Sequence, residues 1–463
     1  MTKENTLTSE VVEYIRGLKF ETINDQVRTE LYRCLVDGFA VMLSGSKAQC
    51  SRIILEYIAL SGVNGTSSLI GSSTQTSPQL AALANGTSGH ADDFDDTQLA
   101  QTPDRIYGLL THPTVPALAA TLAVAQEVNA SGKEFLTAFC GGFEVECKIA
   151  ESMNPQHYKQ GFHTTSTVGV FAAVTAASKL YGLTDEQTRF AIGIAASKSA
   201  GLRVNFGTMT KPYHAGAAAE NGIIAARLAR LGYQSDPNAL DGQWGHFQVT
   251  AGGVDSDRLL GHLGNPYTLA WPGVSVKPFP CGSLSHPSMD TMLDLVLEHD
   301  IRPEAVDEVR LGAGYNILNP LRYESPNNEL EAKFSLQFCL GILLLKRKAG
   351  TAEFTDEVVR SKEVREIMKK VKTYHSPEIE AKGSDRMRSR IEIIMKGGQV
   401  ISRDAETSRG TPERPMGVDG MAAKFTDCAS DVLDSGQIKS ALDAIYNIES
   451  QDDINALVQS MTK

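Results

Sequence analysis

The chain has 463 residues, of which 42% are hydrophobic and 21% are charged, and its formal net charge is −11. This composition excludes wholesale disorder, and the length exceeds the roughly 250–300 residues at which single cores stop growing, so we expect two domains. The negative net charge argues against non-specific nucleic-acid binding. For the same reason, an acidic substrate would need a local cationic pocket.

Up to about residue 260 the sequence has the pattern of successive helices. Three stretches carry apolar residues at helical spacing: 10–18, 26–43 and 51–61. Three others are rich in small residues, which let helices pack closely, and these predict central helices: 113–153, 168–180 and 215–231. Thr184 and Gln187 form a capping-box pattern ahead of a helix over 189–198. No strand-like alternation interrupts this half.

The pattern changes after about Pro266, where Pro, Gly and Ser become frequent. Residues 303–311 predict a turn into a strand, and 390–395 and 399–403 flank a Lys-Gly-Gly hairpin signal. Two helical stretches lie between them, 334–348 and 361–371. The helical pattern resumes over 420–434 and 437–447, and a return of these helices to the first domain would make the α+β unit an insertion.

The first 17 residues and the cysteines indicate a cytoplasmic protein without a membrane partner. No basic start followed by an apolar run is visible, so no signal peptide is expected. The most apolar stretch, 338–345, is far shorter than the roughly 20 residues that span a bilayer. The seven cysteines have no paired spacing, which fits reduced thiols in a reducing compartment.

The densest polar cluster is His90-Ala-Asp-Asp-Phe-Asp-Asp-Thr97. Its carboxylates repel one another by on the order of 1 kcal/mol per close pair unless cations or hydrogen bonds offset them. One interpretation is an aspartate-rich Mg²⁺ site of the terpene-synthase kind, although the second motif of such a site is missing. Another is an aspartate that anchors a catalytic network, and a third is an acidic, solvated helix end.

Histidines and a lysine lie in turns ahead of apolar helices. Lys211 and His214 precede an Ala-rich helix, whose N-terminus favours an anion through its free amides and dipole. The alternative is an exposed lysine and a histidine at the edge of the core. His163 precedes Thr and Ser residues that suit an N-cap. His112 and His286 lie in similar turns beside proline.

Known cofactor and metal motifs are missing from the sequence. We find no His-Glu-x-x-His, no paired Cys motif, no Gly-x-Gly-x-x-Gly fingerprint and no phosphate loop. We therefore expect no cofactor and no metal.

Six motifs, in order along the chain, resemble the MmgE/PrpD family, which includes 2-methylcitrate dehydratase, cis-aconitate decarboxylase and iminodisuccinate epimerase. They are His90…Asp93-Phe-Asp-Asp-Thr97, Thr111-His112-Pro113, Gly161-Phe-His163, Met209-Thr-Lys211-Pro-x-His214-x-Gly216, Lys277-Pro-Phe-Pro…His286-Pro and Glu331-Ala-Lys-Phe-Ser335. The resemblance implies a mainly α fold. A large all-helical domain, 1–270 plus 405–463, would carry an inserted smaller α+β lid domain, 271–404, with the site between them and a homodimer as the assembly.

The resemblance also nominates seven pocket residues: Asp93, Thr97, His112, His163, Lys211, His286 and Tyr323. Reactions of this family make or quench a carbanion beside a carboxylate, which requires cations over the carboxylate and an acid or base poised near neutral pH. We expect His112 and His163 to be proton donor and acceptor, with Asp93 orienting one imidazole. Lys211, His286, Thr97 and Tyr323 would bind the substrate.

We therefore expect a metal-independent lyase, a dehydratase or decarboxylase, that acts on a small di- or tricarboxylate by proton transfer next to a carboxylate. Residues 98–111 form a longer connection than in decarboxylase-like members, and 205–212 is most similar to the epimerase, so an epimerase of an iminodisuccinate-like acid is the alternative. An Mg²⁺-dependent isoprenoid enzyme and a non-catalytic helical binding protein are the remaining hypotheses.

Overall fold

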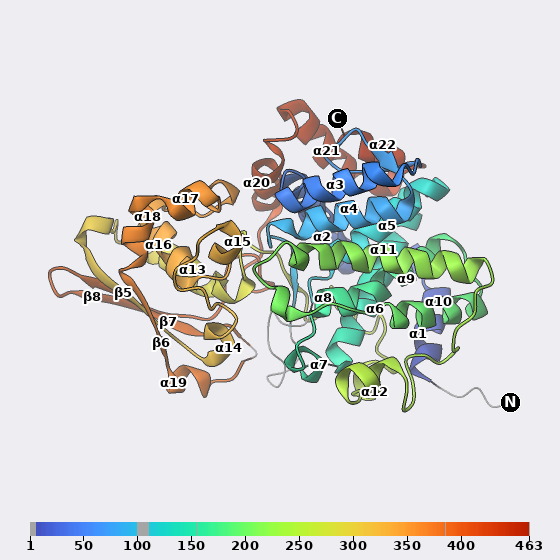
Figure 1. Cartoon of the computed structure of the whole chain (residues 1–463), viewed down its shortest axis with the longest axis horizontal. Coiled ribbons are helices and arrows are strands. Elements are labelled where there is room, and N and C mark those ends of the chain that lie inside the picture. The colour runs from blue at the N-terminus through green and yellow to red at the C-terminus, as the bar shows by residue number, and fades with distance from the viewer. Residues whose placement is uncertain (1–5, 100–110, 154, 385, 463) are drawn as a thin grey trace. The chain divides into compact units, whose positions relative to one another are not determined.

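The computed structural model describes residues 6–99, 111–153, 155–384 and 386–462, which are mainly helical (Figure 1). They divide into two compact units. The first comprises the described residues of 1–91, 109–274 and 418–463, and the second those of 92–108 and 275–417. Both chain ends therefore contribute to the first unit, and the segment after Ala91 belongs to the second.

Helices build almost all of the first unit, and the stretches with helical spacing fold as helices. Their bounds are α1 Leu7–Gly17, α2 Asp25–Gly45, α3 Gln49–Ser61, α4 Pro78–Ala91, α5 Thr114–Val128, α6 Gly132–Met153, α7 Gln156–Lys159, α8 Thr164–Thr167, α9 Gly169–Leu180, α10 Asp185–Ser197, α11 Thr210–Arg230, α12 His246–Ala251, α20 Val418–Ala429, α21 Ser435–Tyr446 and α22 Asn455–Gln459. The capping box ahead of α10 is confirmed: the Thr184 hydroxyl accepts from the Gln187 amide at 3.2 Å, and the Gln187 side chain accepts from the Thr184 amide at 3.0 Å.

Small side chains allow the central helices α4, α5, α9 and α11 to pack against one another. The closest approach is between α4 and α11, at Gly86 and Gly216. A Cβ at Gly86 would lie 2.7 Å from the Cα of Gly216, and one at Gly216 would lie 2.2 Å from the carbonyl oxygen of Leu83. Any side chain here would force the two helices apart.

The first unit also contains a short strand pair that the sequence did not predict. Strands β1 (Ser67–Ser68) and β2 (Gln75–Thr76) are antiparallel. Two residues per strand are too few to produce a recognisable alternation, so this part of an otherwise helical unit gave no strand signal.

A buried ion pair connects the C-terminal helices to the N-terminal ones. The Nζ of Lys424, on α20, lies 2.5 Å from Oδ1 of Asp37 on α2, and both side chains are buried. Six of the seven cysteines are buried, and Cys50 is half-buried. Among the described residues, no helix is both long and apolar enough to cross a bilayer.

The second unit combines a four-stranded sheet with helices. The sheet order is β6-β5-β7-β8, with β5 Val306–Ala313, β6 Val371–His375, β7 Ser389–Met395 and β8 Val400–Ala405. Its helices are α13 His286–Glu298, α14 Tyr315–Leu318, α15 Glu329–Ala332, α16 Leu336–Lys346, α17 Asp356–Arg360, α18 Lys362–Met368 and α19 Pro377–Glu380; the two-residue strands β3 (Thr97–Gln98) and β4 (Val274–Ser275) lie near the unit boundaries.

The predicted hairpin is confirmed, since β7 and β8 pair antiparallel around the Lys-Gly-Gly turn. The predicted helix over 361–371 is too long, because α18 ends at Met368 and β6 follows, parallel to β5. The short β6 gave little alternation signal after the helical pattern of α18.

Candidate active site

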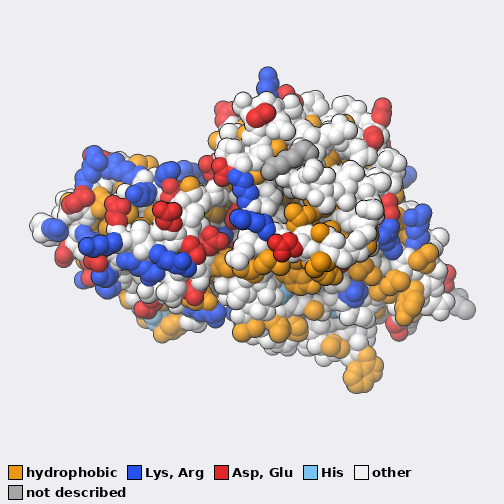
Figure 2. All heavy atoms as spheres, turned by 45° about the horizontal axis from the view of Figure 1, so that its top comes forward, with side chains coloured by type: hydrophobic (Ala, Val, Ile, Leu, Met, Phe, Trp, Pro, Cys, Tyr) orange, Lys and Arg blue, Asp and Glu red, His pale blue; other side chains and the backbone are white. Residues whose placement is uncertain are grey.

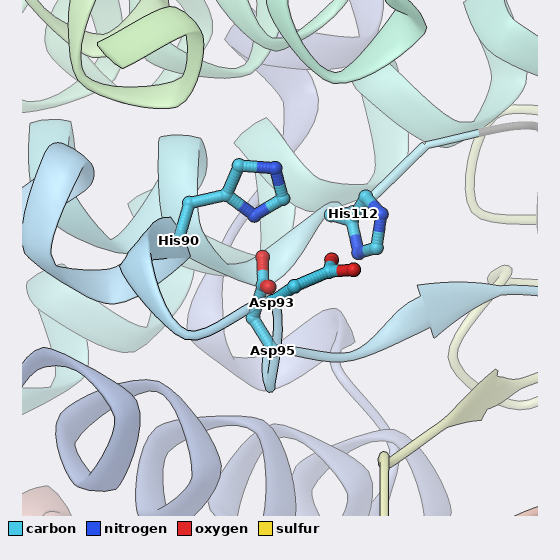
Figure 3. Close-up of side chains that lie close together, drawn as sticks. All are labelled: His90, Asp93, Asp95 and His112. Atoms are coloured by element: carbon cyan, nitrogen blue, oxygen red, sulfur yellow. The ribbon is translucent and has the colours of Figure 1, made fainter. Parts of the chain in front are cut away.

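Five side chains that can carry positive charge gather within the first unit: His90, His112, His163, Lys211 and His214. His90 lies in the last turn of α4, His112 lies two residues before α5, and His163 directly precedes α8. Lys211 and His214 lie in the first turn of α11. All but the half-buried His112 are at most 6% exposed. Figure 3 shows the rings of His90 and His112 beside each other.

The close packing of α4 on α11 places His90 beside Lys211. The Nζ of Lys211 lies 2.8 Å from Nε2 of His90. An ammonium group has only donors, so Nε2 of His90 accepts, and the proton of a neutral His90 ring is on Nδ1. The His90 ring is also stacked on His163, with centroids 5.6 Å apart, and contacts His112 edge-on at 4.8 Å.

His163 and His214 face each other through the same ring atom. Their Nδ1 atoms are 2.9 Å apart, and the edge of the Phe206 ring packs on His163. The amide of His163 donates to the carbonyl of Gly201 at 3.0 Å. Gly201 has a φ of +143°, and a Cβ there would lie 2.6 Å from the Cβ of Ser166. Glycine is therefore required at the backbone that supports His163.

Burial and neighbouring cations keep His163 and His214 uncharged at neutral pH. Burial lowers the pKa of His163 well below its ordinary value, and the ammonium of Lys211 and the nearby rings lower it further. Burial, His90 and Lys211 lower the pKa of His214 to about 4. A neutral imidazole has one bare nitrogen that can take a proton. The cluster therefore combines one ammonium group with neutral rings that can act as bases.

In the second unit, two aspartates of the acidic cluster are paired with lysines. The Nζ of Lys277 lies 2.7 Å from Oδ1 and 2.8 Å from the carbonyl oxygen of Asp93. Asp93 has a left-handed φ of 51°, an uncommon conformation for a residue with a side chain. The Nζ of Lys333 lies 3.4 Å from Oδ1 of Asp92. These pairs offset part of the repulsion between the carboxylates.

The other nominated residues of the second unit are Thr97, His286 and Tyr323. The hydroxyl of Thr97 is buried without a hydrogen-bond partner among the described residues. His286 begins α13 and donates from Nε2 to the carbonyl of Cys281 at 3.1 Å, which leaves Nδ1 as the acceptor of a neutral ring. Tyr323 is half-buried, with its hydroxyl 3.3 Å from a guanidinium nitrogen of Arg322.

Of the nominated residues, the structure brings His112, His163 and Lys211 into one cluster of the first unit. Asp93, Thr97, His286 and Tyr323 lie in the second unit. His90 and His214 were part of the motifs but were not nominated as site residues. His214 follows Lys211 by three positions, one turn of the helix, and this spacing was the signal that could have identified it. Most of the connection over 98–111 lies outside the described residues.

Ammonium groups lie beside several candidate metal ligands within each unit. In the first unit, the cluster offers imidazole nitrogens around an ammonium group, which would repel a cation. In the second, Asp92 and Asp93, the first two residues of the candidate Mg²⁺ motif, have ammonium groups as neighbours. The absence of a metal stays a prediction.

Two family models match most of the chain. The model for the MmgE/PrpD N-terminal domain matches residues 9–258, and that for the C-terminal domain matches 279–448. Cis-aconitate decarboxylase of Mus musculus is 28% identical over 98% of this chain and 93% of its own length, and that of Homo sapiens is 27% identical over 98% and 94%. The enzyme of the same name from Aspergillus terreus is 23% identical over 98% of this chain and 95% of its own length. The chain is therefore an enzyme of the MmgE/PrpD family.

Proposed function

We propose that this enzyme is a metal-independent lyase that acts on a small tricarboxylate, with cis-aconitate as the first candidate, through proton transfer at the carbon next to a carboxylate. The observation that carries the proposal is the buried cluster of neutral imidazoles around the ammonium of Lys211. The similarity to three cis-aconitate decarboxylases over nearly the whole chain supports the decarboxylase as the first reaction to test.

Lys211 has the charge and the burial that a carboxylate-binding group requires. Decarboxylation breaks a C–C bond, releases CO₂ and leaves the electron pair on the carbon next to the remaining carboxylate. A fixed ammonium group stabilises the charge that develops there, and the effect is large where water is excluded. Dehydration generates the same kind of carbanion by loss of a proton, so one constellation suits both reactions.

His163 is the best-placed proton carrier. Its Nε2 is buried and has no hydrogen-bond partner among the described residues. In the free enzyme the ring is neutral, and a bound polyanion would raise its pKa and favour proton uptake. His163, protonated on Nε2, then delivers that proton to the carbanion. We assign His112 as the second acid or base of the reaction.

Four residues of the second unit are proposed to contact the same substrate. Thr97 has a buried hydroxyl without a partner in the described chain. His286 is buried at the start of α13 and would contact the substrate through its ring. Tyr323 would donate from its hydroxyl. Asp93, held by Lys277, would orient an imidazole. The second unit would then act as the lid of the site.

The proposed assembly is a homodimer in the cytoplasm. On α3, Ile53, Tyr57 and Leu60 are exposed. Burial, Glu220 and the neighbouring Tyr57 raise the pKa of Tyr213 on α11, which places Tyr213 near Tyr57. Figure 2 shows hydrophobic side chains on the molecular surface. Large exposed apolar patches on soluble proteins mark protein interfaces.

Turnover of a panel of acids tests the proposed function. The purified enzyme is incubated with citrate, methylcitrate, cis-aconitate, itaconate and aspartate-derived acids, with and without excess chelator, and products and CO₂ are measured. We expect chelator-resistant lyase activity on one tricarboxylate. Lys211→Met should abolish it, whereas Lys439→Met, at an exposed position of α21, should not. Activity lost with chelator, or inversion of a centre as the sole reaction, would contradict the proposal.

A further inference from the structure

We propose that His163 and His214 form a two-imidazole proton relay, in which His214 takes up the Nδ1 proton of His163 when His163 accepts a proton from the substrate, and returns it when His163 gives that proton back, so that His163 stays neutral. This inference rests on the proposed function, because it gives His163 the role of proton carrier. His214 acts through His163 and is therefore a positioning residue.

The geometry of the pair requires a shared proton. The two Nδ1 atoms are 2.9 Å apart, a normal hydrogen-bond distance, so one of them carries the proton and the other accepts it. Both rings are neutral in the free enzyme, and each therefore has a single ring proton. When His163 donates from Nδ1, its Nε2 is bare and His214 carries its own proton on Nε2. When His214 donates, the assignment is reversed.

The first of these two states prepares His163 as a base. Its bare Nε2 is buried without a partner among the described residues, as expected for an atom that meets a proton of the substrate. When Nε2 accepts that proton, the proton on Nδ1 moves to Nδ1 of His214. His163 is again neutral, now protonated on Nε2, and His214 is the imidazolium. The pair gains one proton, at Nε2 of His163, and one positive charge, which resides on His214, so the step is balanced. In the reverse sequence the pair donates a proton.

The surroundings of the two rings favour this direction of charge transfer. His163 is enclosed by Lys211, His90, His112 and His214, all of which disfavour a positive charge on it. His90 and Lys211 also disfavour a positive charge on His214, but His214 is less deeply buried than His163. An imidazolium therefore costs less free energy at His214 than at His163. The starting state is restored when Nε2 of His163 gives its proton to the carbanion and the proton on Nδ1 of His214 returns to Nδ1 of His163.

A variant that keeps the hydrogen bond but cannot hold a proton tests the relay in turnover. His214→Asn places an amide near the former Nδ1, whereas His214→Ala removes the contact. We expect His214→Asn to keep its KM within about twofold and to lose roughly a hundredfold in kcat, the lower limit of the 10²–10⁴-fold that a positioned acid or base contributes. Added imidazole should partly restore kcat of His214→Ala but not of His214→Asn. His262→Asn, at an exposed position, is the matched control.

The ligand-free protein gives a second readout that does not depend on turnover. In ¹⁵N NMR of protein labelled in the histidine rings, His163 and His214 should show complementary protonation of their Nδ1 atoms, and His214→Asn should change the signals of His163. Full kcat in folded His214→Asn, or His163 signals unchanged by that substitution, would overturn the relay. If the wild-type enzyme were inactive on the panel of acids while the ring signals of His163 and His214 remained complementary, the proposed function would be rejected. The shared proton between the two rings would still be established.

Discussion

The ammonium nitrogen of Lys211 lies 2.8 Å from Nε2 of His90, although 121 residues separate them in the chain. The contact exists because α4 and α11 approach each other at Gly86 and Gly216, close enough for backbone to meet backbone. The arrangement of the proposed site therefore depends on two residues that have no chemistry of their own.

Gly216→Ala should weaken both folding and activity. The added Cβ would lie 2.2 Å from the carbonyl oxygen of Leu83, and this backbone atom cannot move independently of α4. We expect a loss of about 1–3 kcal/mol in the free energy of unfolding, typical of overpacking, together with reduced turnover. Urea denaturation and the turnover assay measure the two effects. Gly17→Ala, where no atom lies within 4 Å of the new Cβ, should be nearly neutral.

Stability should fall as the pH drops from about 6.5 towards 4. Burial lowers the pKa of His157 and of His214 to about 4 and that of His246 to about 3, whereas an unfolded chain takes up these protons near pH 6.5. The unfolded state then binds more protons, so stability is fully present above pH 6.5 and is lost below it. Urea midpoints at pH 7.5 and pH 5 measure the loss. The loss of stability between pH 7.5 and pH 5 should be smaller in His246→Gln than in the wild type. An equal loss in both would show that His246 does not cause it.

Lys424→Met should be strongly destabilising because it removes the ammonium group that is paired with the buried carboxylate of Asp37. Breaking a buried ion pair from one side costs roughly 3–5 kcal/mol. The double substitution Asp37→Leu with Lys424→Met should recover most of that loss. Lys439→Met, on the exposed face of α21, serves as the control for loss of a lysine in the same C-terminal segment. Equal effects of the two single lysine substitutions would show that the pair contributes little.

Tyr57→Glu should weaken the proposed homodimer without unfolding the chain. Tyr57 is 54% exposed on α3, beside Tyr213, and a carboxylate there would be desolvated on association. Light scattering after size-exclusion chromatography should give the mass of two chains for the wild type and a shift towards one chain for the variant. A wild-type mass of one chain at micromolar concentration would refute the dimer.

The helices and the hairpin of the second unit could be predicted because their signals are local. Apolar spacing predicted α2, a capping-box pattern predicted α10, and a Lys-Gly-Gly turn between alternating residues predicted β7 and β8. The strand β6 could not, because a five-residue parallel strand depends on its partner β5 more than on its own sequence. The assignment of the segment after Ala91 to the second unit likewise depends on tertiary contacts.

The site could be predicted one residue at a time but not as pairs. His163 and Lys211 were identified by the turns in which they lie, ahead of apolar helices. The contacts of His90 with Lys211 and of His163 with His214 follow from how the helices pack, which a single sequence does not show. The low pKa of His163 is a consequence of the same packing, since burial is its largest cause.

Exchange of hydrogen for deuterium next to a carboxylate tests the central claim most directly. The enzyme is incubated in D₂O with the same panel of acids, and ¹H NMR follows the protons on carbons that bear a carboxylate. The account predicts enzyme-dependent deuterium incorporation at one such carbon, in substrate or product, and its loss in His163→Asn. Turnover of an acid without deuterium at that carbon, or undiminished incorporation by His163→Asn, would contradict it.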